Sequence, residues 1–200
     1  MPYEVKPLPF TKELTGISKK TMDIHHGTLY TGYVNKSNAI EEGIKKADKA
    51  GANATYSEIG ELKRQQSFAV NGVYLHEAYF NCLGGDGKPT GALVDWIKRD
   101  FGSYENWEAD FKAAGMAARG WVILAYDFHK RKLCNYSADV HNQGGIWGCA
   151  SLVVLDVYEH AYFIDFGANR KGYIDAFMAN LNWKAVNETH KVLITQCGAK

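Results

Sequence analysis

The first quarter of the chain mixes apolar and polar residues with a helical period. Between about Lys19 and Ala50, apolar side chains recur at intervals that fit one helix face; the series includes Met22, Leu29, Tyr33, Ile40 and Ile44. This spacing predicts a long amphipathic helix, for which Ser18 offers an N-cap. A break near residues 35–38 is compatible with the same pattern.

A second helical pattern starts near Ser57 and extends to about Cys82. Asn71-Gly72 falls inside it, so a kink or a change of helix is expected there. The two helices would form an antiparallel hairpin. The segment 84–89, which combines three glycines with a helix-stopping proline, is the clearest linker. It predicts two domains, 1–85 and 86–200.

Beyond the linker the pattern changes from helical to alternating. Thr90 and Ser103 offer N-caps for two helices, the first ending near Phe101. The expected elements that follow are strands at 121–128, 132–138 and 151–156, with a polar turn at 129–131, and then helices around 171–181 and 183–192. The predicted fold class is therefore α+β: an N-terminal antiparallel helical hairpin plus a C-terminal α/β half with a three-stranded antiparallel sheet.

Composition indicates an ordinary globular protein, because 46% hydrophobic and 13% aromatic residues suffice for a core. The net charge of +1 gives no electrostatic footprint for nucleic acid or an anionic membrane. The sequence contains neither a secretion signal nor a long apolar span, so we expect a cytoplasmic protein that does not cross a membrane. Four scattered cysteines without a Cys-x-x-Cys pair fit reduced thiols, although their disulfide state stays open.

Asp156 and His160 form the first candidate site. An apolar run at 152–155 ends at Asp156, and His160 follows four residues later. A rigid strand of this kind aims one carboxylate and one imidazole at a common point, which makes half of a metal site. On the first helix, His25 shares its face with Tyr33, and Tyr33 leans back toward whatever His25 binds.

Three segments resemble motifs of the iron/manganese superoxide dismutase family. Residues 156–162 are Asp-Val-Tyr-Glu-His-Ala-Tyr, where the family has Asp-x-Trp-Glu-His-Ala-Tyr, so Tyr158 stands at a tryptophan position. The segments MDIHHGTLYTGYVNK (22–36) and NGVYLHEAYFN (71–81) look like the two family motifs that lie on helices. The resemblance runs from about residue 3 to residue 195.

This resemblance implies a mononuclear site that holds one Fe or Mn ion per chain through three histidines and one aspartate. The implied ligands are His25, His76, Asp156 and His160. Such a ligand set suits Fe or Mn with a coordinated solvent. The implied enzyme is a superoxide dismutase, an oxidoreductase that converts superoxide, its substrate, to O2 and H2O2. The choice between Fe and Mn stays open.

The resemblance also implies roles around the ligands. Tyr33 would belong to the proton and hydrogen-bond path, and Arg170 would attract superoxide and orient Tyr33. Glu159 would reach across a dimer interface to the ligand histidine of the partner, so a homodimer or homotetramer is expected. Leu29 and Phe163 replace a histidine and a tyrosine that usually form a polar bridge between subunits, so we expect an apolar contact there.

In the family, a glutamine usually contacts the metal-bound solvent. This sequence has no glutamine at the usual positions, so another residue is expected in that role. Gly72 occupies the position of this glutamine in iron-type members, and no glutamine aligns cleanly with the manganese-type position. Some members have a histidine instead, so His141 is the predicted group, with Gln143 as the alternative. Three further aromatic residues are expected in the core or cavity wall: Trp121, Trp147 and Trp183.

Two other functions stay open at this level. A metal-stabilised structural or binding module without turnover is compatible with Leu29 and with the displaced glutamine. A zinc hydrolase is disfavoured, because the His-Glu-x-x-His motif is absent: no second histidine follows His76-Glu77 at the required spacing.

Overall fold

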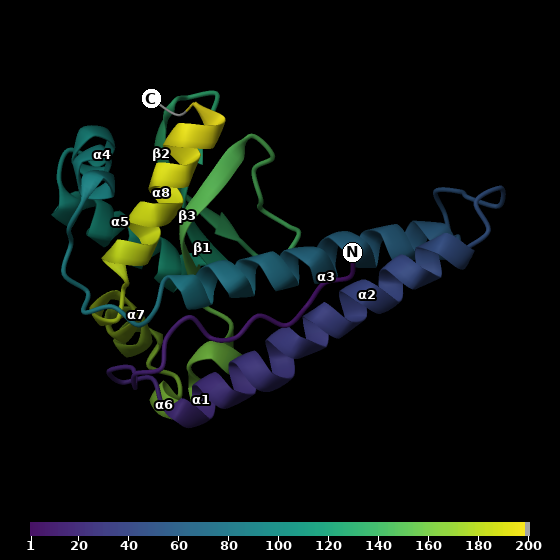
Figure 1. Ribbon diagram of the computed structural model, residues 1–200, viewed down its shortest axis with the longest axis horizontal. Coiled ribbons are helices and arrows are strands. Elements are labelled where there is room, and N and C mark those ends of the chain that lie inside the picture. Colours follow the sequence, from purple (N-terminus) through teal and green to yellow (C-terminus); the bar gives the residue numbers. More distant parts are fainter. Residues whose placement is uncertain (199–200) are drawn as a thin grey trace.

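The N-terminal half of this computed structural model, which describes residues 1–198, is a hairpin of two long helical segments (Figure 1). The first segment consists of α1 (Lys19–Ile24), the π-helix η1 (His25–Tyr30) and α2 (Thr31–Lys46), and the second is α3 (Glu58–Asn81). α2 and α3 pack side by side in opposite directions. The predicted antiparallel hairpin is confirmed.

The first helical segment begins where the sequence predicts, because the Ser18 side chain accepts a hydrogen bond from the Thr21 N–H. At His25 the backbone changes to a π-helix, and the Thr31 N–H donates to the His26 carbonyl five residues earlier. His25 and Tyr30 are the buried residues of this segment, so the buried face advances by five positions here. The break near 35–38 that the pattern allowed does not occur, since α2 continues through it.

α3 is a single helix, so the predicted interruption at Asn71-Gly72 is wrong. Gly72 serves a different purpose. A Cβ added there would lie 2.7 Å from Cδ1 of the Tyr33 ring, closer than real contacts allow. The absence of a side chain therefore lets the Tyr33 ring pack directly against the backbone of α3.

The C-terminal half contains a three-stranded antiparallel sheet with the order β2-β1-β3. Its strands are β1 (Trp121–Asp127), β2 (Lys132–Ala138) and β3 (Cys149–Asp156). This confirms the predicted fold class. Trp121 pairs with Asp156, so the C-terminal end of β3 lies beside the start of β1.

Helices pack against this sheet from one side and from below in the view of Figure 1. α4 (Ala92–Phe101), α5 (Tyr104–Ala117) and α8 (Trp183–Cys197) pack against its strands, α7 (Arg170–Ala179) packs against α5, and α3 reaches β3. The short helices η2 (Glu159–Ala161) and α6 (Phe163–Phe166) follow β3. Ser103 caps α5 as predicted, whereas Gly91, not Thr90, is the N-cap of α4.

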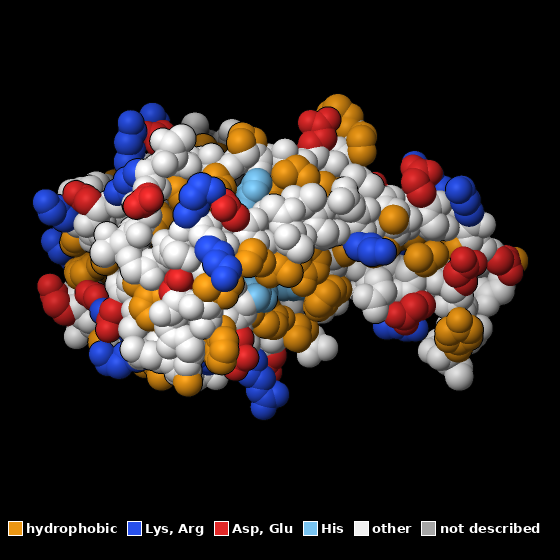
Figure 2. Space-filling view, turned by 90° about the horizontal axis from the view of Figure 1, so that it is seen from below, with side chains coloured by type: hydrophobic (Ala, Val, Ile, Leu, Met, Phe, Trp, Pro, Cys, Tyr) orange, Lys and Arg blue, Asp and Glu red, His pale blue; other side chains and the backbone are white. Residues whose placement is uncertain are grey.

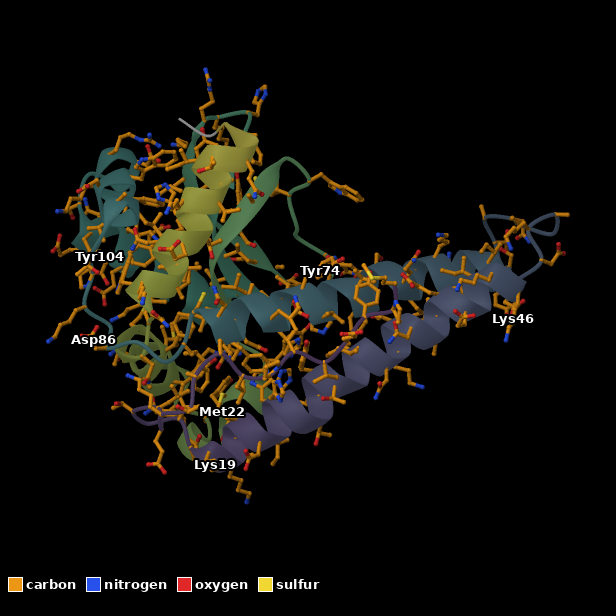
Figure 3. The ribbon with its side chains drawn as sticks, in the orientation of Figure 1. Lys19, Met22, Lys46, Tyr74, Asp86 and Tyr104 are labelled. Carbon is orange, nitrogen blue, oxygen red and sulfur yellow. The ribbon has the colours of Figure 1, made fainter. Side chains whose placement is uncertain are left out.

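The hairpin and the C-terminal half enclose a shared core. Side chains fill the space between them, and Met22 of α1 is buried there while Lys19 points to solvent (Figure 3). Trp121 and Trp183 are buried as predicted, but Trp147 is fully exposed in the loop between β2 and β3. The prediction for Trp147 is wrong, because its loop is exposed from residue 142 to residue 148.

Three cysteines are free thiols: Cys82, Cys134 and Cys149. The side chain of Cys197 lies outside the described part of the structure. Within residues 1–198, no helix combines the length and the apolar character that crossing a membrane requires. The division into domains at residues 85 and 86 stays a prediction.

Candidate metal centre

Four side chains meet where the helical hairpin faces the end of β3. His25 opens η1, His76 lies in α3, Asp156 ends β3 and His160 lies in η2. Asp156 Oδ2 lies 3.1 Å from Nε2 of His25, 3.1 Å from Nε2 of His160 and 3.7 Å from Nε2 of His76. All four ligand atoms lie within 4.8 Å of one another. The structure thus brings together the four predicted ligands from both halves of the chain.

The spacing of these atoms fits a single ion. Metal–nitrogen and metal–oxygen bonds in sites of this kind measure about 2.0–2.2 Å, so two ligands lie about 3.0 Å apart at right angles and about 3.6 Å apart at 120°. The observed separations from Asp156 Oδ2, 3.1 and 3.7 Å, match these values. The donor set of imidazoles and one carboxylate suits Fe or Mn.

His76 is held in a ligand-ready form. Its Nδ1 lies 2.6 Å from the carbonyl oxygen of Gly72. A carbonyl can only accept a hydrogen bond, so Nδ1 carries the proton. Nε2 of the neutral ring then has a free lone pair. This Nε2 is buried and has no hydrogen-bond partner. This nitrogen points at a carboxylate and two other imidazoles, and its lone pair is available to bind a metal ion.

The electrostatics favour a cation. Burial lowers the pKa of the His25 imidazole and lowers that of His76 to about 3, so both are neutral near pH 7. Burial alone would raise the pKa of the Asp156 carboxyl, but the contacts with His160 and His25 outweigh it and hold this pKa below its usual range. The buried carboxylate of Asp156 therefore presents negative charge to an ion, and the Nε2 atom of His76 presents a lone pair.

Access to the cluster is limited. His25, His76 and Asp156 are completely buried, whereas the His160 side chain is 27% exposed. The Tyr158 ring stacks on His160 at 5.3 Å and covers part of it. On the face shown in Figure 2, histidine side chains appear only as small patches. Of the four side chains, His160 is the one that solvent reaches.

Asp156 is fixed by its own local backbone. Its Oδ1 accepts a hydrogen bond from the Tyr158 N–H at 2.9 Å, which is an Asx-type turn. The Val157 N–H donates to the carbonyl of Gly120 at 2.8 Å. With Oδ1 occupied by the backbone, Oδ2 is the oxygen that faces the three imidazoles.

Tyr33 and His141 form a hydrogen-bonded chain beside the cluster. The Trp121 indole N–H donates to His141 Nδ1 at 2.9 Å, and His141 Nε2 lies 2.7 Å from the Tyr33 hydroxyl oxygen. Burial lowers the pKa of His141 to about 4, so the ring is neutral near pH 7. Because Nδ1 accepts, Nε2 carries the proton and donates to Tyr33. The Tyr33 proton is then left for another acceptor.

Both ring nitrogens of His141 are therefore engaged, and its predicted direct contact with metal-bound solvent stays a prediction. The alternative, Gln143, has an exposed side chain. In the described part of the chain only the backbone of Gln143 takes part in the local structure, through hydrogen bonds with Asp139 and Val140.

Arg170 and Glu159 lie at the edge of this region. The Arg170 guanidinium donates to the Tyr162 hydroxyl at 3.2 Å and to the Ala118 carbonyl at 2.8 Å. Within residues 1–198 no hydrogen bond joins it to Tyr33, so its orienting role stays a prediction. Glu159 is exposed and forms no side-chain hydrogen bond or ion pair in the described part of the chain.

Sequence reasoning missed the contribution of Trp121. It was predicted as core or cavity wall, but its indole also donates to His141 and its ring lies edge-on to His76 at 5.1 Å. No spacing in the sequence links Trp121 to either histidine. The strand pairing of Trp121 with Asp156 is what places the indole at the site.

Comparisons with known proteins agree with this geometry. The family model for iron/manganese superoxide dismutases, alpha-hairpin domain, matches residues 2–84, and the model for the C-terminal domain of the same family matches residues 89–189. A superoxide dismutase [Fe] of Aquifex pyrophilus is 43% identical over 182 residues, which cover 88% of this chain and 85% of the relative. Superoxide dismutase [Mn] 1 of Halobacterium salinarum is 39% identical over 192 residues, which cover 93% and 94% of the two chains.

Proposed function

The chain belongs to the iron/manganese superoxide dismutase family, a family of oxidoreductases, and on that premise we propose that it disproportionates superoxide to O2 and H2O2 with one Fe or Mn ion per chain. The ion is held by His25, His76, Asp156 and His160. The observation that carries this proposal is the convergence of three Nε2 atoms on Asp156 Oδ2, among them the partnerless Nε2 of His76.

A bound Fe or Mn ion supplies one-electron redox chemistry, which takes an electron from one superoxide and gives it to a second. The protein residues do the remaining work. The side chains of His25, His76 and Asp156 are completely buried, so bulk water does not reach them, and His160 is the ligand that stays partly exposed in the single chain. Formation of H2O2 also requires protons.

Tyr33 is the proton donor best placed for this task. Its oxygen accepts from His141 Nε2, so its own hydroxyl proton is free to point toward the cluster. Burial raises the pKa of Tyr33, which keeps the hydroxyl protonated near neutral pH. His141 acts through Tyr33 and fixes the direction of this hydroxyl, while Trp121 fixes the tautomer of His141.

The active form is a homodimer in which Glu159 bonds the partner subunit's His160. Three observations support it. Glu159 is exposed and lacks a partner within residues 1–198. Phe163 and Ile164, which follow it in α6, are large apolar side chains with exposed fractions of 54% and 46%. Leu29 of η1 is half-buried and offers the apolar contact predicted in place of a polar bridge. We place the enzyme in the cytoplasm.

Metal analysis and activity assays of separately Fe-, Mn- and Zn-loaded protein test the proposal. We expect one tightly bound ion per chain, with dismutase activity in the Fe form, the Mn form or both, and none in the Zn form. Asp156→Ala removes the carboxylate on which the imidazoles converge and should abolish stoichiometric binding, while Asp95→Ala, on the exposed surface of α4, should behave as wild type. An Asp156→Ala protein with one tight ion and full activity would contradict the ligand assignment.

A further inference from the structure

Two buried tyrosines meet behind the end of β3. The Tyr173 hydroxyl, on α7, donates to the backbone carbonyl oxygen of Asp156 at 2.6 Å. Its oxygen also lies 3.1 Å from the hydroxyl oxygen of Tyr79, on α3. Tyr79, Tyr173 and Asp156 are all 0% exposed, so these groups depend on one another for their hydrogen bonds.

The direction of this chain is fixed by chemistry. A carbonyl oxygen can only accept, so Tyr173 must use its single hydroxyl proton for Asp156. The remaining contact between the two hydroxyls then requires Tyr79 to donate to Tyr173. The order is therefore Tyr79 to Tyr173 to Asp156, and Tyr173 is the member that touches the aspartate.

This chain connects the elements that carry three of the proposed ligands. Tyr79 follows His76 by three residues on α3, and its ring centroid lies 5.1 Å from that of His25. Tyr173 comes from α7 and reaches Asp156 on β3. The hydroxyl pair thus spans the junction between the helical hairpin and the C-terminal half, at the backbone carbonyl of Asp156.

We infer that Tyr173 is a positioning residue for the metal site: its bond to the Asp156 carbonyl holds the carboxylate in place for the ion before the ion binds. The side chain of Asp156 has one backbone anchor, the Tyr158 N–H on Oδ1. The backbone carbonyl of Asp156 is anchored by the Tyr173 hydroxyl. Both ends of the residue are then fixed, and Oδ2 is presented at a set position. This inference rests on the metal site proposed above.

The two tyrosines should respond differently to loss of a hydroxyl. Tyr173→Phe leaves the Asp156 carbonyl and the Tyr79 hydroxyl unpaired in the interior. Without an ion the end of β3 can relax to relieve this, and ion binding must then restore its position. Loss of such an outer partner typically weakens metal affinity about 10- to 100-fold. Tyr79→Phe keeps the bond between Tyr173 and Asp156, so its affinity should stay within about threefold of wild type.

Chelator competition on wild type, both single variants and the double Phe variant measures this affinity for Mn and Fe. The visible absorption band of the oxidised, metal-loaded proteins gives a second readout, because it depends on the position of the Asp156 carboxylate relative to the ion. We expect Tyr173→Phe to lose affinity about 10- to 100-fold and to shift the band, with Tyr79→Phe close to wild type in both.

The double variant separates positioning from stability. It removes the unpaired Tyr79 hydroxyl, so metal-free protein should regain part of the urea resistance that Tyr173→Phe loses, while metal affinity stays low because the Asp156 carbonyl is still unpaired. A purely structural role predicts that affinity recovers together with stability, and that result overturns the inference.

Two other results would also overturn the inference. One is wild-type metal affinity in a folded Tyr173→Phe protein, and the other is a loss of metal affinity in Tyr79→Phe equal to that in Tyr173→Phe. If Tyr173→Phe does not fold, Tyr79→Phe decides alone: affinity within about threefold of wild type supports the proton order, and a loss above tenfold refutes it. Wild-type protein that binds neither Fe nor Mn would instead refute the proposed function, which keeps the two failures distinct.

Discussion

Replacing Gly72 by alanine should move the Tyr33 ring and disturb its bond to His141. The added Cβ would lie 2.7 Å from Cδ1, 2.8 Å from Cγ and 3.1 Å from Cε1 of Tyr33, so the ring or the helix must shift. Overpacking of this kind costs about 1–3 kcal/mol. Exchange of glycine for alanine inside a helix gains about 1 kcal/mol. The net loss of stability is therefore about 0–2 kcal/mol.

Gly32→Ala is the matched control. It lies on α2 beside Tyr33, and a Cβ there meets nothing within 4 Å. This variant should gain up to about 1 kcal/mol from helix propensity. Urea unfolding of the metal-free proteins should therefore separate Gly72→Ala from Gly32→Ala by about 1–3 kcal/mol, at unchanged m-value.

Activity of the metal-loaded proteins gives the second measurement. His141→Ala removes the donor to Tyr33, and its loss of activity defines the effect of breaking that bond at 2.7 Å. The activity of Gly72→Ala should fall toward this value with little loss of bound metal. Gly32→Ala should keep wild-type activity, and so should Gln143→Ala, because the Gln143 side chain is exposed. If Gly72→Ala equals Gly32→Ala in both stability and activity, the contact between Gly72 and Tyr33 has no functional weight.

Two further predictions concern the subunit interface and pH. Truncation of a charge-assisted hydrogen bond at an interface costs about 2–5 kcal/mol, so Glu159→Ala should dissociate at concentrations where wild type is dimeric. Sedimentation velocity checks this. An unchanged dimer with unchanged activity counts against the bond between Glu159 and the partner subunit's His160. Burial, and to a lesser extent the charge of Arg99, lowers the pKa of His190 in the fold. Its contribution to stability is therefore complete above the unfolded pKa of about 6.5, and it is lost progressively as pH falls from that value through the lower pKa of the folded state. Between pH 7.5 and 5.5 the urea midpoint of metal-free protein should fall more in wild type than in His190→Gln, and equal falls would exclude this role.

The elements of the fold were predictable because their signals are local. The apolar period of the first helical segment and the alternation in the three strands arise from which side of each element faces the core. The failures have a tertiary cause. Gly72 was interpreted as a break because glycine weakens a helix, yet α3 continues and the glycine accommodates the ring of Tyr33, a residue 39 positions earlier in the sequence. The π-helix at His25–Tyr30 was missed, because one extra residue per turn leaves an ordinary helical pattern on either side.

The candidate site was predictable only as a set of candidate ligands. Spacing alone placed Asp156 at the end of a strand with His160 four residues later, and the family resemblance supplied His25 and His76. The partners of these ligands were not predictable in the same way. Tyr173 and Trp121 occupy positions that would suit any buried aromatic residue, and the sequence cannot show what their polar atoms reach. Those contacts depend on how α7 and β1 pack against β3.

The contacts around the site share a physical property that explains how one arrangement is selected without an ion. Each hydrogen-bonded chain includes a group with a single option: the Gly72 carbonyl can only accept from His76, the Trp121 indole can only donate to His141, and the Asp156 carbonyl can only accept from Tyr173. One fixed end determines the proton positions along the whole chain. The lone pair of His76, the free hydroxyl proton of Tyr33 and the placement of Asp156 therefore follow from packing of uncharged groups. Titration near neutral pH cannot reverse these proton positions while His76 and His141 have pKa values of about 3 and about 4.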